Sequence, residues 1–186
     1  MLRVLILFII LNFYSPVFSS TKEKIVSKLQ LTNNLSFNFV QTIGKKNENG
    51  KCIIKYPGKI WCKYNSSNKK IIVSNGKSLV IKTSNNGKGS YFRYPIKKTL
   101  LELLLNKEYL ISKMKTLKPR KIDNKYLNFK IIENNNEINI FFDIKNLSLV
   151  GWQTEDIYQN LTVTFISSVK TNQKIDNKIF ILPSSY

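Results

Sequence analysis

Alternation of apolar and polar residues dominates this 186-residue chain and predicts β-strands along most of its length. Residues 35–42 (LSFNFVQT) place Leu35, Phe37 and Phe39 on one face and mostly polar side chains on the other. Further predicted strands occupy residues 69–74, 77–83, 90–94, 126–132, 138–144, 147–154, 161–169 and 178–182. Because short polar turns join most of these runs, we expect one antiparallel sheet of about ten or eleven strands.

The stretch from residue 49 to residue 65 (NGKCIIKYPGKIWCKYN) predicts a hairpin with a Tyr-Pro-Gly corner at residues 56–58. The proline fixes its own φ and cannot donate to a ladder, whereas the glycine accepts a positive φ, so this is turn chemistry. Counting outward from the corner places Cys52 opposite Cys62. The apolar face of the hairpin then consists of Cys52, Ile54, Tyr56, Ile60, Cys62 and Tyr64.

Two short segments have a helical period instead. Thr21–Leu31 is amphipathic, and a second helix is expected to follow a capping box formed by Thr99 and Glu102. The apolar residues of this second helix are Leu100, Leu101, Leu103, Leu104 and Leu105. A helix that is apolar on all sides lies either deep in a core or over an apolar ligand. Residues 44–49 are expected to form a polar loop, and residues 109–121 an extended, partly irregular segment.

The first residues have the pattern of a secretory signal peptide. Arg3 gives a positive start, residues 4–11 are continuously apolar, and residues 17–19 fit a cleavage site. The apolar run is too short to span a bilayer. We therefore expect removal of residues 1–19 and a single domain over residues 20–186, with no lipid anchor because no cysteine follows the cleavage site.

Lysine gives the chain a strongly positive charge: it has 30 Lys and Arg, 11 Asp and Glu, and no His, for a formal net charge of +19. Such a charge can indicate a nucleic acid or an anionic membrane as partner. Proteins that read DNA grooves rely on arginine, however, and only Arg93 and Arg120 follow the predicted signal peptide. The scattered lysines favour a solvated surface, with attraction to a membrane or an acidic partner as the alternative; nucleic acid is not expected.

The same composition leaves little for catalysis. Without histidine there is no imidazole base or ligand, and no glycine-rich phosphate loop joins a strand to a helix. The adjacent acidic residues Glu155 and Asp156 fit a solvated turn better than a catalytic pair. We expect no enzyme activity, no cofactor and no metal. In an exported chain, Cys52 and Cys62 are typical of one disulfide, with two buried thiols as the alternative.

The predicted sheet offers more apolar surface than two short helices can cover. If the sheet curls towards a barrel, the excess surrounds a cavity, and apolar cavities bind ligands; complete filling by side chains is the alternative. The side chains expected to line the cavity are Phe37, Phe39, Ile54, Ile60, Cys62, Tyr64, Leu79, Ile81, Ile140, Phe142, Val163 and Phe165.

The order of LSFNFVQT, KYPGKIWCKY, IIVSNGKSL, KKTLLELLLNK, GWQTED, NLTVTF and KIFILP behind a signal peptide resembles LolA, the family of periplasmic carriers of outer-membrane lipoproteins. The resemblance covers essentially the whole mature chain. It implies an α+β fold, in which an unclosed antiparallel barrel and a short-helix lid enclose an apolar cavity. It also implies a soluble periplasmic monomer that takes triacylated lipoproteins from an inner-membrane ABC transporter and delivers them to an outer-membrane acceptor lipoprotein.

The resemblance assigns roles to three positions in the hairpin. Ile60 occupies the place of a cavity-lining aromatic residue, and Cys62 that of a common cavity-facing tryptophan. Tyr56 stands where many members have an arginine that holds the lid shut. Since a tyrosine hydroxyl makes fewer hydrogen bonds than a guanidinium, Tyr56 is the candidate for a weaker latch, with a latch carried by another group as the alternative. Two other functions remain open: a protein of the same fold that binds free lipid or another hydrophobic ligand, and a cationic surface-binding module.

Overall fold

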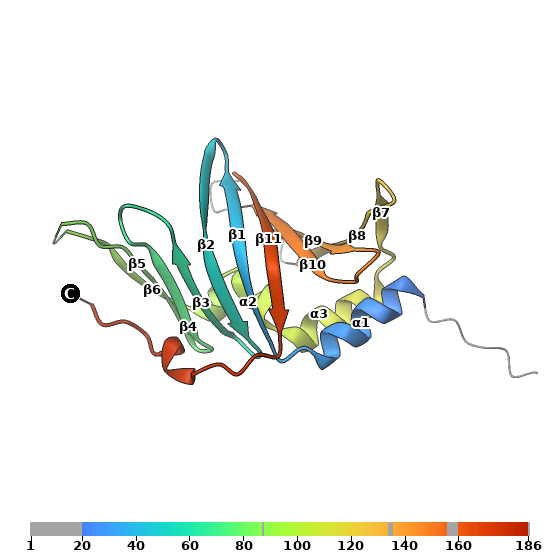
Figure 1. Ribbon diagram of the computed structural model, residues 1–186, viewed down its shortest axis with the longest axis horizontal. Coiled ribbons are helices and arrows are strands. Elements are labelled where there is room, and N and C mark those ends of the chain that lie inside the picture. The colour runs from blue at the N-terminus through green and yellow to red at the C-terminus, as the bar shows by residue number, and fades with distance from the viewer. Residues whose placement is uncertain (1–19, 87, 134–135, 156–159, 186) are drawn as a thin grey trace, which may run out of the picture.

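The computed structural model describes residues 20–86, 88–133, 136–155 and 160–185 (Figure 1). The predicted signal peptide and Asp156 lie outside these ranges. Within the described residues, no helix has both the length and the apolar character needed to cross a bilayer.

Eleven antiparallel strands form a single sheet that stays open, with β6 at one edge and β7 at the other. The strands are β1 (Asn34–Ile43), β2 (Lys46–Lys55), β3 (Lys59–Tyr64), β4 (Ile71–Asn75), β5 (Ser78–Lys82), β6 (Tyr91–Pro95), β7 (Arg120–Ile122), β8 (Tyr126–Glu133), β9 (Asn136–Asp143), β10 (Leu149–Glu155) and β11 (Leu161–Thr171). Their order across the sheet is β6-β5-β4-β3-β2-β1-β11-β10-β9-β8-β7. The predicted α+β class and unclosed curved sheet are confirmed.

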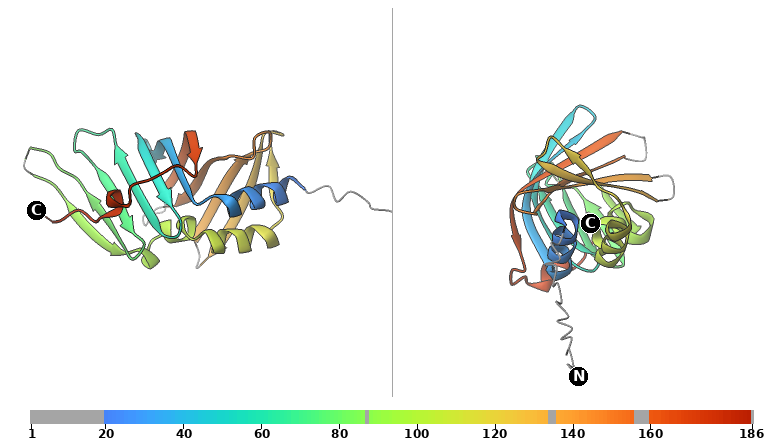
Figure 2. Two further views of the ribbon diagram at one scale, coloured as in Figure 1. Left: turned by 60° about the horizontal axis from the view of Figure 1, so that its bottom comes forward. Right: turned by 90° about the vertical axis from the view of Figure 1, so that its right-hand side faces the viewer.

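The described residues also form three α-helices and two short 3₁₀ helices. They are α1 (Thr21–Leu31), η1 (Ile96–Lys98), α2 (Leu101–Leu105), α3 (Lys107–Thr116) and η2 (Asn177–Phe180). The helices α1 and α3 lie side by side against the concave side of the sheet, beneath the strands β8 to β11 (Figures 1 and 2). The C-terminal segment with η2 crosses the opposite, outer face near β3 and β4.

The hairpin of β2 and β3 has the predicted register. Cys52 pairs with Cys62 and Ile54 with Ile60. The two cysteines form a disulfide bond, with Cα atoms 4.1 Å apart. The predicted disulfide is therefore confirmed.

Four local predictions were wrong. Residues 46–49 continue β2, because a two-residue turn at Gly44 lets Lys46 pair with Ile43. Residues 107–116 form α3 rather than an extended segment. Here the Asn106 side chain caps the helix by accepting from the Tyr109 N–H at 3.1 Å, and Leu110 and Met114 are buried one turn apart.

The other two wrong predictions concern residues 177–180 and the start of α2. Residues 177–180 form η2 where a strand was expected. The helix α2 has no Thr99 capping box, because its N-cap is Leu100 and the Thr99 hydroxyl donates to the Ile96 carbonyl at 2.7 Å. A capping box does occur at α1, where the Ser20 and Glu23 side chains each accept from the other's backbone N–H.

Burial is concentrated on the concave face of the sheet. One continuous hydrophobic cluster joins inward residues of eight of the described strands, and Ile96 of η1, to the apolar faces of α1, α2 and α3. Its most deeply buried members include Phe129 and Met114, both at 0 % exposure. A smaller buried group outside that cluster contains Val73, Val80 and Phe180. The 3₁₀ helix η2, which contains Phe180, lies against the outer face of β3 and β4.

A candidate apolar ligand site

A cavity of about 180 Å³ lies between the concave face of the sheet and the three helices. Its lining is almost entirely apolar and comes from both layers. The strands and their connections contribute Leu35, Ile54, Tyr56, Ile60, Ile140, Phe142, Leu147, Ser148, Leu149, Trp152, Val169 and Thr171. The helices and the end of α1 contribute Ile25, Lys28, Leu29, Thr32, Leu101, Leu104, Leu105, Leu110 and Met114.

The strand residues reach the cavity because of the period of two along each strand. Ile54 and Ile60 face each other across the β2–β3 pair, and Trp152 pairs with Ile140 across β10 and β9. Phe37 supports Trp152 in an edge-to-face contact with ring centroids 6.1 Å apart. The concave face of the sheet therefore presents a rigid apolar surface to the helices, and this surface is called the floor below.

The size of the cavity decides what this closed arrangement can hold. An engineered cavity of about 150 Å³ binds benzene, and sites for drug-sized ligands have about 300–1,000 Å³. At about 180 Å³, the present cavity accepts one small apolar group but not several fatty acyl chains. A larger ligand requires α2 and its neighbouring helices to move away from the floor.

Backbone and lysine contacts hold the helices in the closed position. The Gly58 N–H, at the corner between β2 and β3, donates to the Leu105 carbonyl at the end of α2 (3.0 Å). At one end of the α1–α3 pair, the Lys107 amine donates to the Gln30 and Thr32 carbonyls, each at 3.1 Å. At the other end, the Lys22 amine donates to the Lys115 carbonyl at 2.7 Å.

These two lysines act reciprocally. Each one comes from the first residues of one helix and binds the free carbonyls at the C-terminal end of the other, where the helix dipole favours a positive charge. Such an arrangement requires the antiparallel alignment of α1 and α3. Since α3 was not predicted from the sequence, this pairing could not be predicted either.

Glu133 ties α3 to the sheet. Its carboxylate accepts from the Tyr109 hydroxyl at 2.8 Å and pairs with the Lys113 amine at 2.9 Å. The hydrogen bonds from Lys113 and Tyr109 lower the pKa of the Glu133 carboxyl below its usual value. Burial and the same carboxylate raise the pKa of the Tyr109 hydroxyl. Both shifts favour the ionised glutamate and the neutral tyrosine in the closed state.

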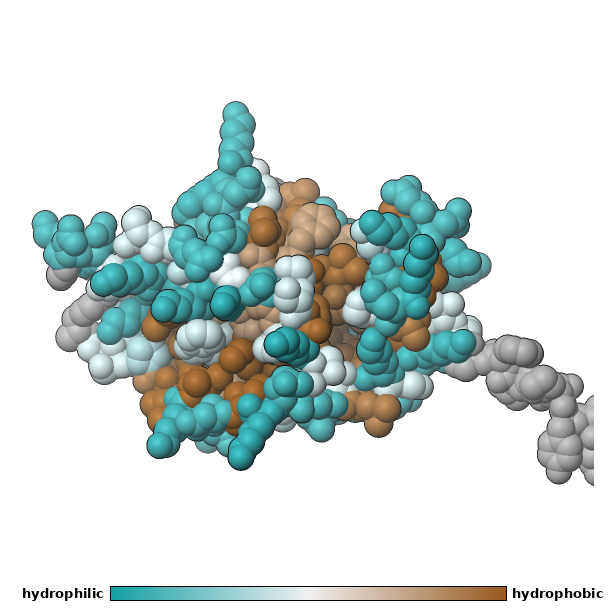
Figure 3. Space-filling model, in the orientation of Figure 1, coloured by the Kyte–Doolittle hydropathy of each residue, from teal (hydrophilic) through white to brown (hydrophobic). Residues whose placement is uncertain are grey.

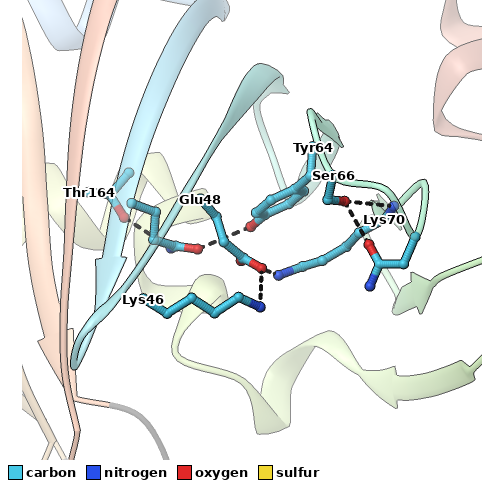
Figure 4. A network of polar contacts seen from close by, with 8 residues as sticks. Lys46, Glu48, Tyr64, Ser66, Lys70 and Thr164 are labelled. Atoms are coloured by element: carbon cyan, nitrogen blue, oxygen red, sulfur yellow. Dashed lines mark hydrogen bonds and ion pairs between the residues drawn. The ribbon is translucent and has the colours of Figure 1, made fainter.

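A polar network occupies the concave side at the other end of the strands (Figure 4). The Tyr64 hydroxyl donates to the Gln41 side chain at 3.2 Å, and that side chain donates to the Thr164 hydroxyl at 3.1 Å. Beside them, Glu48 pairs with Lys46 at 2.8 Å and with Lys70. Burial alone would raise the pKa of the Glu48 carboxyl, but the hydrogen bonds from the two lysines outweigh it and leave the pKa below its usual value. The network ends the apolar floor with charged and hydrogen-bonded groups.

The structure brings four of the twelve predicted ligand-binding residues to the cavity itself: Ile54, Ile60, Ile140 and Phe142. Phe37, Phe39, Cys62, Tyr64 and Leu79 belong to the same hydrophobic cluster without lining the cavity. Ile81 is partly exposed on the concave face, beyond the helices. Of the predicted lid leucines, Leu101, Leu104 and Leu105 line the cavity, whereas Leu100 and Leu103 are partly exposed.

Val163 and Phe165 lie on the outer face instead. Alternation predicted correctly that they share a face, but Thr162, Thr164 and Ile166 are the buried residues of β11. Phe165 is 58 % exposed and, with Val163 and Phe141, borders a second pocket of about 200 Å³ at Gly151. A Cβ at Gly151 would lie 2.1 Å from the Thr164 carbonyl oxygen, which explains the glycine. In this strand Thr162 and Thr164 face inward and the apolar Val163 and Phe165 face outward, so alternation alone does not show which face is buried.

Tyr56 lines the cavity, as its place at the corner suggests, and burial raises the pKa of its hydroxyl. The Lys107 amine lies 5.8 Å from the centre of its ring. Its hydroxyl makes no hydrogen bond to another described residue, so the described contacts that close the lid come from Gly58, Lys107, Lys22 and Glu133. The latch role of Tyr56 remains a prediction.

A curved open sheet and a set of short helices thus surround a largely apolar cavity, a geometry suited to a hydrophobic ligand. Within the part of the chain that the structure describes, no group of three His, Cys, Asp or Glu side chains is placed to hold a metal. The family model described as "Outer membrane lipoprotein carrier protein LolA" matches residues 30–182. The chain therefore belongs to the LolA family, whose members are carrier proteins.

No curated protein sequence matches the chain. Solved structures resemble it only distantly. A LolA superfamily protein from Nitrosomonas europaea has 10 % identity and a TM-score of 0.48, over 88 % of this chain and 99 % of its own. An outer membrane lipoprotein-sorting protein domain from Vibrio parahaemolyticus has 10 % identity and a TM-score of 0.39, over 85 % and 95 % of the two chains. The MucA/MucB complex of Pseudomonas aeruginosa gives 6 % identity and a TM-score of 0.47, over 89 % and 62 %.

Proposed function

We propose that this protein is a periplasmic carrier that holds the acyl chains of lipoproteins beneath its helical lid and moves them from the inner to the outer membrane. The observation that supports this most directly is a largely apolar cavity beneath the leucine side chains of α2, in a chain that belongs to the LolA family. The signal peptide, the inner-membrane transporter and the outer-membrane acceptor belong to the same proposal.

Transfer then depends on competing apolar burial. An acyl chain gains about 0.8 kcal/mol for each methylene that leaves water. In the closed state, Leu101, Leu104 and Leu105 occupy the space that the acyl chains would take. Cargo displaces these leucines, and the contacts of Gly58 and Lys107 with the lid set how readily it opens. An acceptor with a larger apolar site would draw the cargo onward.

A charge placed in the floor tests the site. Ile60 is 3 % exposed and faces the cavity, so Ile60→Glu is expected to abolish retention of a triacylated lipopeptide in native mass spectrometry of residues 20–186. Leu101→Glu, at a partly exposed lid position, serves as a second variant that disturbs folding less. Phe165→Glu on the outer face is the matched control and is expected to retain the lipopeptide.

Circular dichroism establishes that each variant folds. Retention of lipopeptide by folded Ile60→Glu and Leu101→Glu proteins would contradict the site. Wild-type protein that carries a free fatty acid or phospholipid, and takes up no lipopeptide, would support the alternative of a free-lipid binder with the same fold. The bound mass distinguishes these outcomes directly.

A further inference from the structure

The positive charge of the protein is distributed very unevenly along the chain. Residues 49–101 contain twelve Lys and Arg and no Asp or Glu, whereas residues 20–48 and 102–186 contain 17 Lys and Arg and all 11 Asp and Glu. The twelve basic residues are Lys51, Lys55, Lys59, Lys63, Lys69, Lys70, Lys77, Lys82, Lys88, Arg93, Lys97 and Lys98. This segment forms β3 to β6, η1 and most of β2, and Glu48 of β2 is the one acidic side chain in these described elements.

The strand register gathers part of this charge on the outer face. Lys51 pairs with Lys63 across β2 and β3, and Lys55 pairs with Lys59. The row of Lys51 and Lys63 continues through Ile71 to Lys82. These lysines alternate with the inward residues of the same strands, so they point away from the cavity. We call Lys51, Lys55, Lys59, Lys63, Lys82 and Arg93 the lysine face.

Like charges placed directly opposite each other destabilise a sheet. The lysine face contains two such cross-strand pairs, in Lys51–Lys63 and Lys55–Lys59. The ion pairs among the described residues use Lys46, Lys70, Lys113 and Lys130, and none involves these four lysines. Repulsion within these two pairs lowers the stability of the folded chain, and an anionic surface outside the chain would offset that repulsion.

The chemistry of the lysine face fits a lipid surface better than an acidic protein or a nucleic acid. Arginine is preferred where a carboxylate or a base edge is recognised in fixed geometry, and eleven of the twelve basic residues are lysine. Lysines act as point charges and suit the diffuse negative potential of an anionic leaflet. The C-terminal segment adds an apolar anchor, because Ile181 is 69 % exposed next to η2. Figure 3 shows hydrophobic surface near η2, bordered by hydrophilic side chains over β2 to β6.

We propose that the lysine face, with Ile181, binds bilayers that contain anionic phospholipids and thereby places the carrier on a membrane with its outer face against the lipid headgroups. The C-terminal segment is fixed in position for this role. The Lys55 amine donates to the Asn177 side chain at 2.7 Å, and the Lys59 amine lies 6.0 Å from the centre of the Phe180 ring. This membrane contact uses no residue of the cavity, so it can be tested without cargo.

Sedimentation with vesicles tests the proposal. Residues 20–186 are expected to bind vesicles of phosphatidylcholine mixed with phosphatidylglycerol, to bind pure phosphatidylcholine far more weakly, and to lose binding as salt rises. Lys51→Gln with Lys63→Gln is expected to weaken binding about 10- to 30-fold, at about fivefold for each lysine. The matched control, Lys24→Gln with Lys121→Gln, removes the same charge from exposed positions elsewhere and is expected to stay within about twofold of wild type.

Ile181→Ser is expected to weaken vesicle binding by a further severalfold. The double variant at residues 51 and 63 removes a like-charge pair, so its urea midpoint is expected to equal or exceed that of wild type, and this excludes misfolding as the cause. Equal binding to neutral and anionic vesicles, or equal losses in the two double variants, would overturn the proposal. So would binding that depends on Lys51 and Lys63 but is seen only with double-stranded DNA or polyglutamate.

Discussion

The two ends of the sheet differ in how their concave sides are covered. Beneath β8 and β9, the inward residues Phe129, Ile131 and Ile138 are at most 1 % exposed, and α1 and α3 lie against this end. At the other end, Phe92 and Tyr94 of β6 face the same side of the sheet but are 51 % and 42 % exposed. We call these the covered end and the open end.

The comparison shows which end of the sheet contributes most to the stability of the fold and which end leaves apolar side chains exposed to solvent. The helices lie where the floor is most apolar, so burial at the covered end contributes most to the hydrophobic free energy of folding. The concave side of the open end continues the same floor through Ile72 and Ile81 without a helix of its own. The exposed aromatic rings of the open end therefore lie on the same side of the sheet as the cavity. Three changes test this division, from the largest expected effect to the smallest.

Phenylalanine truncation at the two ends is expected to have the largest contrast. Phe129→Ala removes a fully buried ring in edge-to-face contact with Phe142, at a centroid distance of 5.9 Å, and should cost about 3–5 kcal/mol. Phe92→Ala removes a half-exposed ring and should cost less than about 1 kcal/mol. Urea unfolding measures both values. Similar costs at the two positions would show that the open end is as tightly packed as the covered end.

The disulfide joins two strands between these ends and is expected to have an intermediate effect. Closing a loop with a sequence separation of 10 residues should contribute about 2–3 kcal/mol in the chain-entropy model. Replacing Cys52 and Cys62 by alanine, or adding a reductant to the wild-type protein, should lower the free energy of unfolding by that amount. The reductant should leave the double-alanine variant unchanged. An equally stable reduced wild type would show that β2 and β3 need no covalent support.

The features that could be predicted from the sequence are those determined by residues close to each other along the chain. Alternation and turn chemistry gave the strand count and the register of the β2–β3 hairpin, which places Ile54 and Ile60 in the cavity. Spacing alone could not decide which side of β11 faces inward. There the apolar Val163 and Phe165 lie outside, and Thr164 is buried through its bond to Gln41. Only the positions of the neighbouring strands determine that choice.

The closing contacts of the lid could not be predicted because they join residues far apart in the sequence. Gly58 meets Leu105, Lys107 meets the end of α1, and Glu133 meets Tyr109 only after the sheet has formed. The family resemblance directed attention to Tyr56 as the latch. That role remains a prediction, and the polar contacts seen between the helices and their surroundings in the described residues are made by backbone carbonyls and a glutamate.

Acid is expected to loosen the covered end through Glu133, with the smallest effect of the three. Because Lys113 and Tyr109 lower the pKa of this carboxyl in the folded protein, its contribution is fully present above the usual glutamate pKa of about 4.3. The contribution is lost as the pH falls through the lowered value. The difference in unfolding free energy between wild type and Glu133→Gln should therefore be present at about pH 6 and decline as the pH falls through that lowered value.

Glu108→Gln is the matched control, since this exposed glutamate lies on the same helix and makes no contact with Glu133. In a Trp61→Phe background, the fluorescence of Trp152 reports the cavity it lines, and it should shift to longer wavelength in acid for wild type. In Glu133→Gln it should be shifted already near neutral pH. If the Glu133→Gln difference persists unchanged in acid, the carboxylate does not hold α3 against the sheet, and the covered end is closed by packing alone.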